Sequence, residues 1–448
     1  MTRLAGSLPR ALGCLTLAAL VYASAPPPDA LRTGLALFVL IGGLWMTQAL
    51  HLSVTALLVP LLAVLTGLTD LRTALTSFAH PIIFLFLGGF ALAAALQRQG
   101  LDRSLAQAVL RLAAGRRDAA VALLFGLTAL LSMWISNTAT AAMMLPLALG
   151  LLRDEDGPAE RAFVLLGVAY SASIGGIGTL VGSPPNAIAA AQAGIGFAEW
   201  MRFGVPLVLL LLPLMVGVLF LLLRPGLGGR SLPLDERSPA MPWSRSQRVT
   251  LVVFGLTAAG WIGAAPLGRA LGVTADIDTA VALAAIVALV LSGAIQWPDI
   301  ESRTQWGVLL LFGGGLALSE VMAVSGASRF LAGALTDALQ GAPTFLLLLG
   351  VVAFVVFLTE LVSNTASAAL LVPIFLGVST SLGLPPLLLA AAIAASASCA
   401  FMLPVATPPN AIVYATEQVP QATMMRCGLV LNLVCITAIT ALATAALR

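Results

Sequence analysis

The sequence has little charge for its length. Of its 448 residues only 9% are charged, whereas 60% are hydrophobic. Soluble domains carry about a quarter charged residues on average. Many of the apolar runs in this chain also reach the ~20 residues that span a bilayer. The composition therefore excludes a soluble globular protein and predicts an all-α protein with many membrane spans, for which lipid is an obligatory partner.

The sequence also lacks lysine, so the net charge of +3 comes entirely from arginine. This small excess bears on membrane topology and does not indicate a nucleic-acid partner. The histidines, His51 and His80, are too far apart to suggest a metal site. The four cysteines lie in apolar segments without ligand spacing, at Cys14, Cys399, Cys427 and Cys435. We interpret them as small packing residues and expect no cofactor.

Against this apolar background, two polar interruptions occur twice. Ser136-Asn137-Thr138 interrupts the run 119–152, and its echo in the run 344–377 is Ser363-Asn364-Thr365. Each is followed by a second broken segment, with Gly182-Ser183-Pro184-Pro185-Asn186 in 161–194 and Ala406-Thr407-Pro408-Pro409-Asn410 in 385–416. Asn364 follows Asn137 by 227 residues, and Asn410 follows Asn186 by 224. Matched breaks in the two halves of a hydrophobic chain are typical of a transporter binding site.

The spacing of these breaks divides the chain. The run 119–152 is too long for one simple span and meets charged loops at both ends, so it predicts a re-entrant hairpin with its polar triplet at the tip. Its echo 344–377 predicts a second hairpin of the same kind. We expect a first helix and N-terminal segment over 1–32, a first repeat over 33–223, a cytoplasmic linker over 224–248 and a second repeat over 249–448. Each repeat then has five crossings and one hairpin. Because five is odd, the repeats are inverted.

Arginine placement gives the orientation. With the amino terminus in the cytoplasm, sixteen arginines fall on the cytoplasmic side and six outside, which is the usual bias. We therefore predict a protein of the cytoplasmic (inner) membrane with eleven spans and an external carboxyl terminus. The first apolar segment also resembles a cleavable signal peptide. We favour a retained helix, and a stretch at 100–115 is predicted to lie in the membrane interface.

The polar tips suggest an anion site. Ser, Asn and Thr cap helix N-termini, so a tip reading Ser-Asn-Thr starts its second arm at membrane depth with free N–H groups. In the other breaks, proline ends the preceding half-helix and leaves carbonyl oxygens available to a cation. A hydroxyl also precedes each tip by one turn, at Ser132 and Thr359. Together these groups form neutral oxygen sites suited to Na+.

The broken segments contain no basic residue in 119–152, 162–201, 344–378 or 385–416. A dianion would then need cations to travel with it, unless a basic side chain reaches in from another helix. Two intramembrane carboxylates, Glu320 and Glu360, leave three interpretations open: proton coupling, indirect support of the second ion site, or a protonated group hydrogen-bonded between helices. The glycine runs at 88–89 and 313–315 predict close helix crossings.

The paired motifs resemble those of the divalent anion/sodium symporters, the INDY-type transporters of di- and tricarboxylates and sulfate. The resemblance covers essentially the whole chain. It implies a homodimer in which a scaffold domain supports an elevator-like transport domain. It also implies a first Na+ site at Ser132, Ser136, Asn137 and Gly182, and a second at Thr359, Val362, Asn364 and Ala406. The implied substrate-binding residues are Ser136, Asn137, Thr138, Ser183, Ser363, Asn364, Thr365, Thr407 and Pro408.

These features predict a secondary transporter that imports a C4-dicarboxylate such as succinate, malate or fumarate together with Na+. A sulfate or tricarboxylate (citrate) symporter and a dicarboxylate exchanger are rival hypotheses within the same family. An anion channel is a rival from another class, because re-entrant tips also occur there. An enzyme is not expected, since no catalytic constellation of Ser/His, paired Asp or His/Glu lies at membrane depth.

Overall fold

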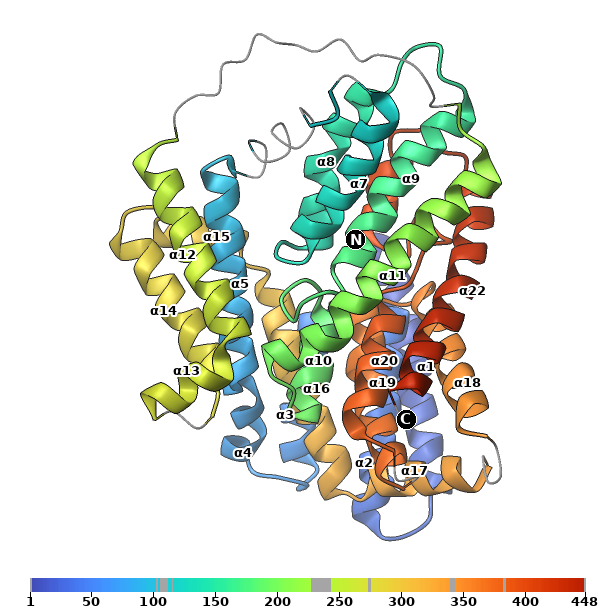
Figure 1. The fold of residues 1–448 in the computed structure, drawn as a ribbon. Coiled ribbons are helices and arrows are strands. Elements are labelled where there is room, and N and C mark those ends of the chain that lie inside the picture. Colours follow the sequence, from blue (N-terminus) through green and yellow to red (C-terminus); the bar gives the residue numbers. More distant parts are fainter. Residues whose placement is uncertain are drawn as a thin grey trace.

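The computed structural model describes residues 2–101, 104, 112–114, 116–226, 243–272, 275–338, 343–381 and 384–446. Within these residues the regular elements are helices (Figure 1). The predicted interfacial stretch 100–115 and the linker 224–248 fall largely outside the described residues. The all-α fold class is confirmed.

The first half contains α1 (Thr2–Ser24), α2 (Asp29–Thr47), α3 (Leu52–Leu65), α4 (Leu71–Thr76), the 3-10 turn η1 (Ser77–Ala79), α5 (Pro81–Arg98), α7 (Arg117–Ser132), α8 (Asn137–Leu151), α9 (Pro158–Gly175), α10 (Pro184–Ala193) and α11 (Phe197–Leu223). The helix α1 packs on α2, where Cys14 lies 3.8 Å from the Thr47 hydroxyl. All four cysteines are buried free thiols, as their interpretation as packing residues requires.

The second half contains α12 (Arg245–Ile262), α13 (Ala264–Leu271), α14 (Ile277–Leu291), α15 (Trp297–Arg303), α16 (Trp306–Val324), α17 (Ala327–Ala338), α18 (Thr344–Thr359), α19 (Asn364–Ser381), α20 (Pro386–Ala397), α21 (Pro408–Tyr414) and α22 (Gln421–Ala445). The sequence pattern did not indicate the separate short helices α4, α13 and α15. Helix α13 turns by 87° from α12, so the predicted span at 249–264 ends in a sharp bend.

The two hairpins lie at opposite ends of the molecule. Helices α7 and α8 pack together and have their base at the top of Figure 1, whereas α18 and α19 have theirs at the bottom. Their tips approach each other in the middle. Helix α10 packs on α19 and α20, and its counterpart α21 packs on α8 and α9. Each short half-helix therefore contacts the hairpin of the other half.

Glycine allows the closest helix crossings. A Cβ atom at Gly88 of α5 would lie 2.6 Å from Ala282 Cβ of α14, and one at Gly314 of α16 would lie 2.5 Å from Ala56 Cβ of α3. The predicted role of both glycine runs is thus confirmed. By the spacing of the two halves, α5 corresponds to α16 and α14 corresponds to α3. The contact between α5 and α14 is therefore repeated as the contact between α16 and α3, as expected of a repeat.

Six of the described helices are long and apolar enough to cross a membrane, and a seventh is counted if α12 and α13 form one span. Shorter apolar helices of 10–17 residues, among them α3 and α14, lie where other crossings are predicted. The prediction of eleven spans depends on these short helices and on the two broken ones.

The broken segments differ from their predicted form. Helix α9 ends at Gly175, nine residues before Pro184, and α10 begins with Pro184 and Pro185 in its first turn behind Ser183. Pro408 and Pro409 likewise open α21 behind Thr407. The prediction that the prolines end the preceding half-helix is therefore wrong. Proline fits the first helical turn, where its missing N–H leaves no hydrogen bond unmade.

Candidate functional site

The tip of the first hairpin is capped as its sequence predicts. Helix α7 ends at Ser132 and α8 starts at Asn137, with the Ser136 hydroxyl accepting a hydrogen bond from Ala139 N at 3.4 Å. The Ser132 hydroxyl donates to the carbonyl oxygen of Ala172 in α9 at 2.6 Å. Ser132 therefore fastens the end of α7 to the last turns of α9, directly behind the tip.

The side chain of Asn137 points toward this hydrogen bond between Ser132 and Ala172. Its Oδ1 position lies 2.8 Å from Ser132 Oγ, 3.2 Å from Ala172 O and 3.3 Å from Gly182 O. A group surrounded by these oxygens is satisfied in two ways. Either the amide rotates so that its N–H groups donate to them, or the amide oxygen remains and a cation occupies the space between the oxygens.

Close backbone packing shapes this cluster. A Cβ atom at Gly176 would lie 2.3 Å from the Asn137 side-chain oxygen, and one at Gly182 would lie 2.6 Å from Gly176 O. Only glycine leaves room for Asn137 to enter the loop that follows α9. The cluster contains three of the predicted ion-site residues, Ser132, Asn137 and Gly182. It adds the carbonyl of Ala172, which the sequence pattern did not single out.

The second hairpin repeats this geometry. The Thr359 hydroxyl lies 2.8 Å from Asn364 Oδ1 and donates to Ala397 O at 3.0 Å. Thr359, Asn364 and Ala397 correspond in turn to the serine, asparagine and alanine of the first cluster. Two separate parts of the chain thus build the same arrangement of a hydroxyl, an amide and a carbonyl oxygen.

The asparagines after the proline pairs organise the two loops. Asn186 Nδ2 donates to Gly176 O at 2.8 Å and to Thr179 O at 2.7 Å. Asn410 Nδ2 donates to Ala400 O at 3.1 Å and to Leu403 O at 3.0 Å. These loop carbonyls were expected to be available to a cation. Some of them already accept hydrogen bonds, because each asparagine side chain donates to the carbonyl oxygens of the residues seven and ten positions before it.

Glu360 supports the second loop. It is 4% exposed, and its carboxylate accepts hydrogen bonds from the backbone N–H groups of Phe401, Met402 and Leu403 at 2.7–3.1 Å. Asn432 Nδ2 of α22 donates to it at 2.7 Å. Four donors at one carboxylate favour the interpretation that Glu360 supports the second ion site indirectly. Glu320 is exposed on α16 and lies outside the cavity lining.

The two tips and the two loops enclose a cavity of about 350 Å³. All nine predicted substrate-binding residues line it: Ser136, Asn137, Thr138, Ser183, Ser363, Asn364, Thr365, Thr407 and Pro408. Of the predicted ion-site residues, Gly182, Val362 and Ala406 also line it, whereas Ser132 and Thr359 are fully buried behind the tips. The structure therefore brings together residues from distant parts of both halves of the chain.

Residues from other helices close the cavity. Gln48 at the end of α2 and Gln305 before α16 contribute amides, and Phe86 and Phe90 of α5 contribute rings. None of these four residues was predicted from the sequence. The one sequence feature that could have indicated Gln48 and Gln305 is a glutamine at the end of an apolar helix. Among the residues that the structure describes, no arginine or histidine lines this cavity.

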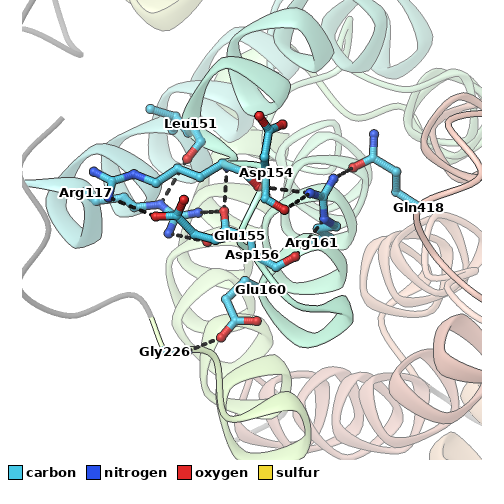
Figure 2. A network of polar contacts seen from close by, with 10 residues as sticks. Arg117, Leu151, Asp154, Glu155, Asp156, Glu160, Arg161, Gly226 and Gln418 are labelled. Carbon is cyan, nitrogen blue, oxygen red and sulfur yellow. Dashed lines mark hydrogen bonds and ion pairs between the residues drawn. The ribbon is translucent and has the colours of Figure 1, made fainter. Parts of the chain in front are cut away.

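The base of the first hairpin is held by a buried ion pair (Figure 2). The Arg117 guanidinium and the Asp156 carboxylate are both 0% exposed and form two hydrogen bonds, one of them at 2.8 Å. Arg117 also donates to Leu151 O at 3.0 Å. Arg161 of α9 joins this base to the second half of the chain by donating to Gln418 Oε1 at 2.8 Å. The arms of the hairpin and the loop before α22 are thereby connected.

Two polar hairpin tips that meet at a cavity inside an apolar helical protein define a membrane transporter for a small anion. The comparisons with known proteins agree. The model of a family described as "Citrate transporter" matches residues 43–394 and 278–447. The chain belongs to this family, that of the divalent anion/sodium symporters. It is therefore a transporter rather than an enzyme.

Several relatives match along most of their length. The chain is 49% identical over 418 residues to an uncharacterized transporter of Haemophilus influenzae, covering 91% of this chain and 90% of the relative. It is 33% identical over 429 residues to the sodium-dependent dicarboxylate transporter SdcS of Staphylococcus saprophyticus, covering 88% and 82%. The YdaH transporter of Alcanivorax borkumensis shares the fold, with a TM-score of 0.56, 16% identity and coverage of 99% and 98%.

Proposed function

We propose that the protein imports a C4-dicarboxylate such as succinate, malate or fumarate together with Na+. The observation that carries this proposal is the pair of matching oxygen clusters, at Asn137 and Asn364, in a cavity lined by no basic side chain among the described residues. A dianion in this cavity is neutralised by cations bound at these clusters. The name of the staphylococcal relative supports both the ion and the substrate class.

The proposed binding geometry uses both tips. Helix α8 and helix α19 begin at Asn137 and Asn364, so each tip directs free N–H groups and a partial positive charge toward the cavity. Each carboxylate of a C4-dicarboxylate would contact one tip, assisted by Thr138 and Thr365. Ser183 and Thr407, at the starts of α10 and α21, would contact it from the sides.

Alternating access would follow an elevator mechanism. The hairpins together with α9–α11 and α20–α22 would move as the transport domain against a scaffold that contains α3, α5, α14 and α16. We further propose a homodimer in the cytoplasmic membrane, with the amino terminus in the cytoplasm and the carboxyl terminus outside.

A test of the coupling uses purified protein in proteoliposomes. Uptake of labelled succinate down an inward Na+ gradient is expected to stop when choline replaces Na+, because neither oxygen cluster binds the larger cation. Equal uptake in choline and Na+ would refute the coupling. Conductance far above the turnover of a carrier would instead identify an anion channel.

The second candidate substrate is citrate, which the description of the matching family model favours. Competition of labelled succinate uptake by unlabelled malate, citrate and sulfate separates a dicarboxylate carrier from a citrate or sulfate carrier. We expect malate to compete most strongly. Uptake that requires a dicarboxylate on the opposite side of the membrane would identify a dicarboxylate exchanger.

A further inference from the structure

A second cavity, of about 740 Å³, lies between the end of α5 and helix α8. The α5 side supplies residues 97–100, α8 supplies Ala139, Ala142 and Met143, and Arg303 comes from the end of α15. We call this space the vestibule. The end of α5 and helix α15 lie toward the end of the molecule where the first hairpin has its base (Figure 1). None of its residues lines the transport cavity, although Ala139 N donates to Ser136 at the first tip.

The vestibule and the transport cavity are lined by the same two helices, α5 and α8. On α5, Phe90 lines the transport cavity and Gln97 lines the vestibule, which is a separation of about 10 Å along the helix axis. On α8, Thr138 lines the first space and Ala139 the second. The vestibule therefore lies next to the transport cavity along both helices.

The corresponding part of the second hairpin is tightly packed. Ala369 and Leu370 of α19 correspond to Ala142 and Met143 of α8, and they pack against helices instead of lining a cavity. A Cβ atom at Gly315 of α16 would lie 3.2 Å from Ala369 Cβ, and one at Gly42 of α2 would lie 2.8 Å from the Leu370 side chain. At this position of the second hairpin, helix packing thus takes the place of the space that Ala142 and Met143 line in the first.

Two arginines give the vestibule its charge. Arg98 Nε and Arg303 Nη1 each lie 3.5 Å from the same oxygen of Asp299. Two guanidinium groups against one carboxylate leave a net charge of +1. The side chains of Arg98 and Arg303 are 58% and 38% exposed, and the long contacts to Asp299 leave their other N–H groups available to a second anion.

We propose that Arg98 and Arg303 form an anion-collecting site in the vestibule, which holds a dianion before it binds to, or after it leaves, the neutral transport cavity. Guanidinium groups bind carboxylate and sulfate in forked geometry, so the site selects small oxyanions by charge. The proposal rests on the proposed function, because it concerns the same dianion. The two arginines should therefore affect transport from the vestibule side of the membrane and leave transport from the opposite side unaffected.

The test compares right-side-out with inside-out membrane vesicles at saturating Na+. In Arg98→Gln and Arg303→Gln, the KM for succinate presented from the vestibule side should rise roughly three- to tenfold, since a vestibule charge is lost. The KM from the opposite side should stay unchanged. Asp299→Asn should lower the vestibule-side KM, because it removes the competing carboxylate. Added choline chloride should reduce these differences by screening.

Arg269→Gln, at an exposed position on α13, removes a charge outside both cavities and serves as the matched control. Arg98→Lys keeps the charge and should restore most of the wild-type KM. An equal rise from both sides, or no rise in either glutamine variant, would overturn the vestibule site. Wild-type vesicles that transport no succinate with Na+ would contradict the proposed function instead, and the comparison is then repeated with the dianion that they do transport.

Discussion

At the scale of single residues, the two tip asparagines carry the site. Asn137 and Asn364 each lie beside a buried hydroxyl and a carbonyl oxygen of a neighbouring helix. An amide is suited to this position because it offers an oxygen to a cation and, after rotation, N–H groups to the same oxygens when the cation has left. A carboxylate cannot do both, because it has no hydrogen to donate, and a hydroxyl offers one donor where the amide offers two.

Replacing Asn137 or Asn364 by alanine should therefore abolish coupling at one cluster. We expect Na+-driven succinate uptake to fall roughly 10- to 100-fold in either variant, as the loss of a hydrogen bond to a charged group implies. Thermal unfolding in detergent is the control. Both variants should fold, yet Na+ should stabilise them less than wild type, because fewer ions bind the folded state. Wild-type uptake in both variants would remove the site assignment.

The ion pair of Arg117 and Asp156 makes a different prediction. Arg117→Met leaves a buried carboxylate without its partner, so the protein should lose about 3–5 kcal/mol of stability. The double variant Arg117→Met/Asp156→Leu should be more stable than the single one, because no buried charge remains. Melting temperatures of the three proteins test this order. A single variant as stable as wild type would contradict it.

The same pair predicts sensitivity to acid. Burial alone raises the pKa of Asp156, but hydrogen bonds from Arg117 and Arg153 N outweigh it and hold the pKa below its ordinary value of 3.8. A carboxyl group whose pKa is lowered in the folded protein stabilises the fold fully when the pH is above the ordinary pKa. This stabilisation is lost as the pH falls through the lowered pKa. The wild-type protein should therefore lose more stability below about pH 4 than the double variant does.

At the scale of elements, the packing of α7 on α9 sets the position of the first tip. A Cβ atom at Gly175, the last residue of α9, would lie 2.2 Å from Ala129 O and 2.5 Å from Ala129 Cα. Both are backbone atoms of α7, so no side chain can move aside. The helices must separate, and the Ala172 carbonyl moves away from Asn137.

Gly175→Ala should accordingly cost about 1–3 kcal/mol through overpacking and reduce Na+-dependent uptake. Gly126→Ala, on α7, is the matched control. A Cβ atom there meets nothing within 4 Å, and alanine favours the helix, so this variant should be as stable as wild type or slightly more stable. If Gly175→Ala and Gly126→Ala unfolded alike, close packing would not be what places the tip.

The sequence allowed us to predict those features that depend on a few neighbouring residues. The tips could be placed because Ser136 and Asn137 form a polar cap within an apolar run, and the glycine crossings because a repeated pair marked them. The ends of α9 and α20 were misplaced because proline starts a helix as readily as it ends one. Gln48 and Gln305 were missed because their approach to the tips depends on how α2 and α16 pack, which no local pattern contains.

At the scale of the whole molecule, the halves are alike at the tips but differ in their surroundings. Glu360 and Asn432 support the second loop, whereas the corresponding positions in the first half are Met133 and Val208. The second loop therefore has a buried carboxylate behind it and the first has none. The two hairpins also differ in their surroundings, because Ala369 and Leu370 of α19 pack against helices whereas Ala142 and Met143 of α8 line the vestibule.

The number of coupled ions follows from the charge of the whole cavity. With one cation at each oxygen cluster and no basic lining residue among those described, two Na+ neutralise one dianion. A loaded transport domain then carries no net charge across the membrane. We therefore expect two Na+ per dianion and a transport rate that a clamped membrane potential leaves unchanged, since no net charge moves through the field.

A null-point measurement in proteoliposomes tests this count. A tenfold Na+ gradient supplies about 1.4 kcal/mol for each ion. Two ions should therefore balance a succinate gradient of about a hundredfold, whereas one would balance about tenfold and three about a thousandfold. A balance at about a thousandfold together with a rate that rises at negative potential would require a third cation. The match between two tips, two clusters and one neutral complex would then be wrong.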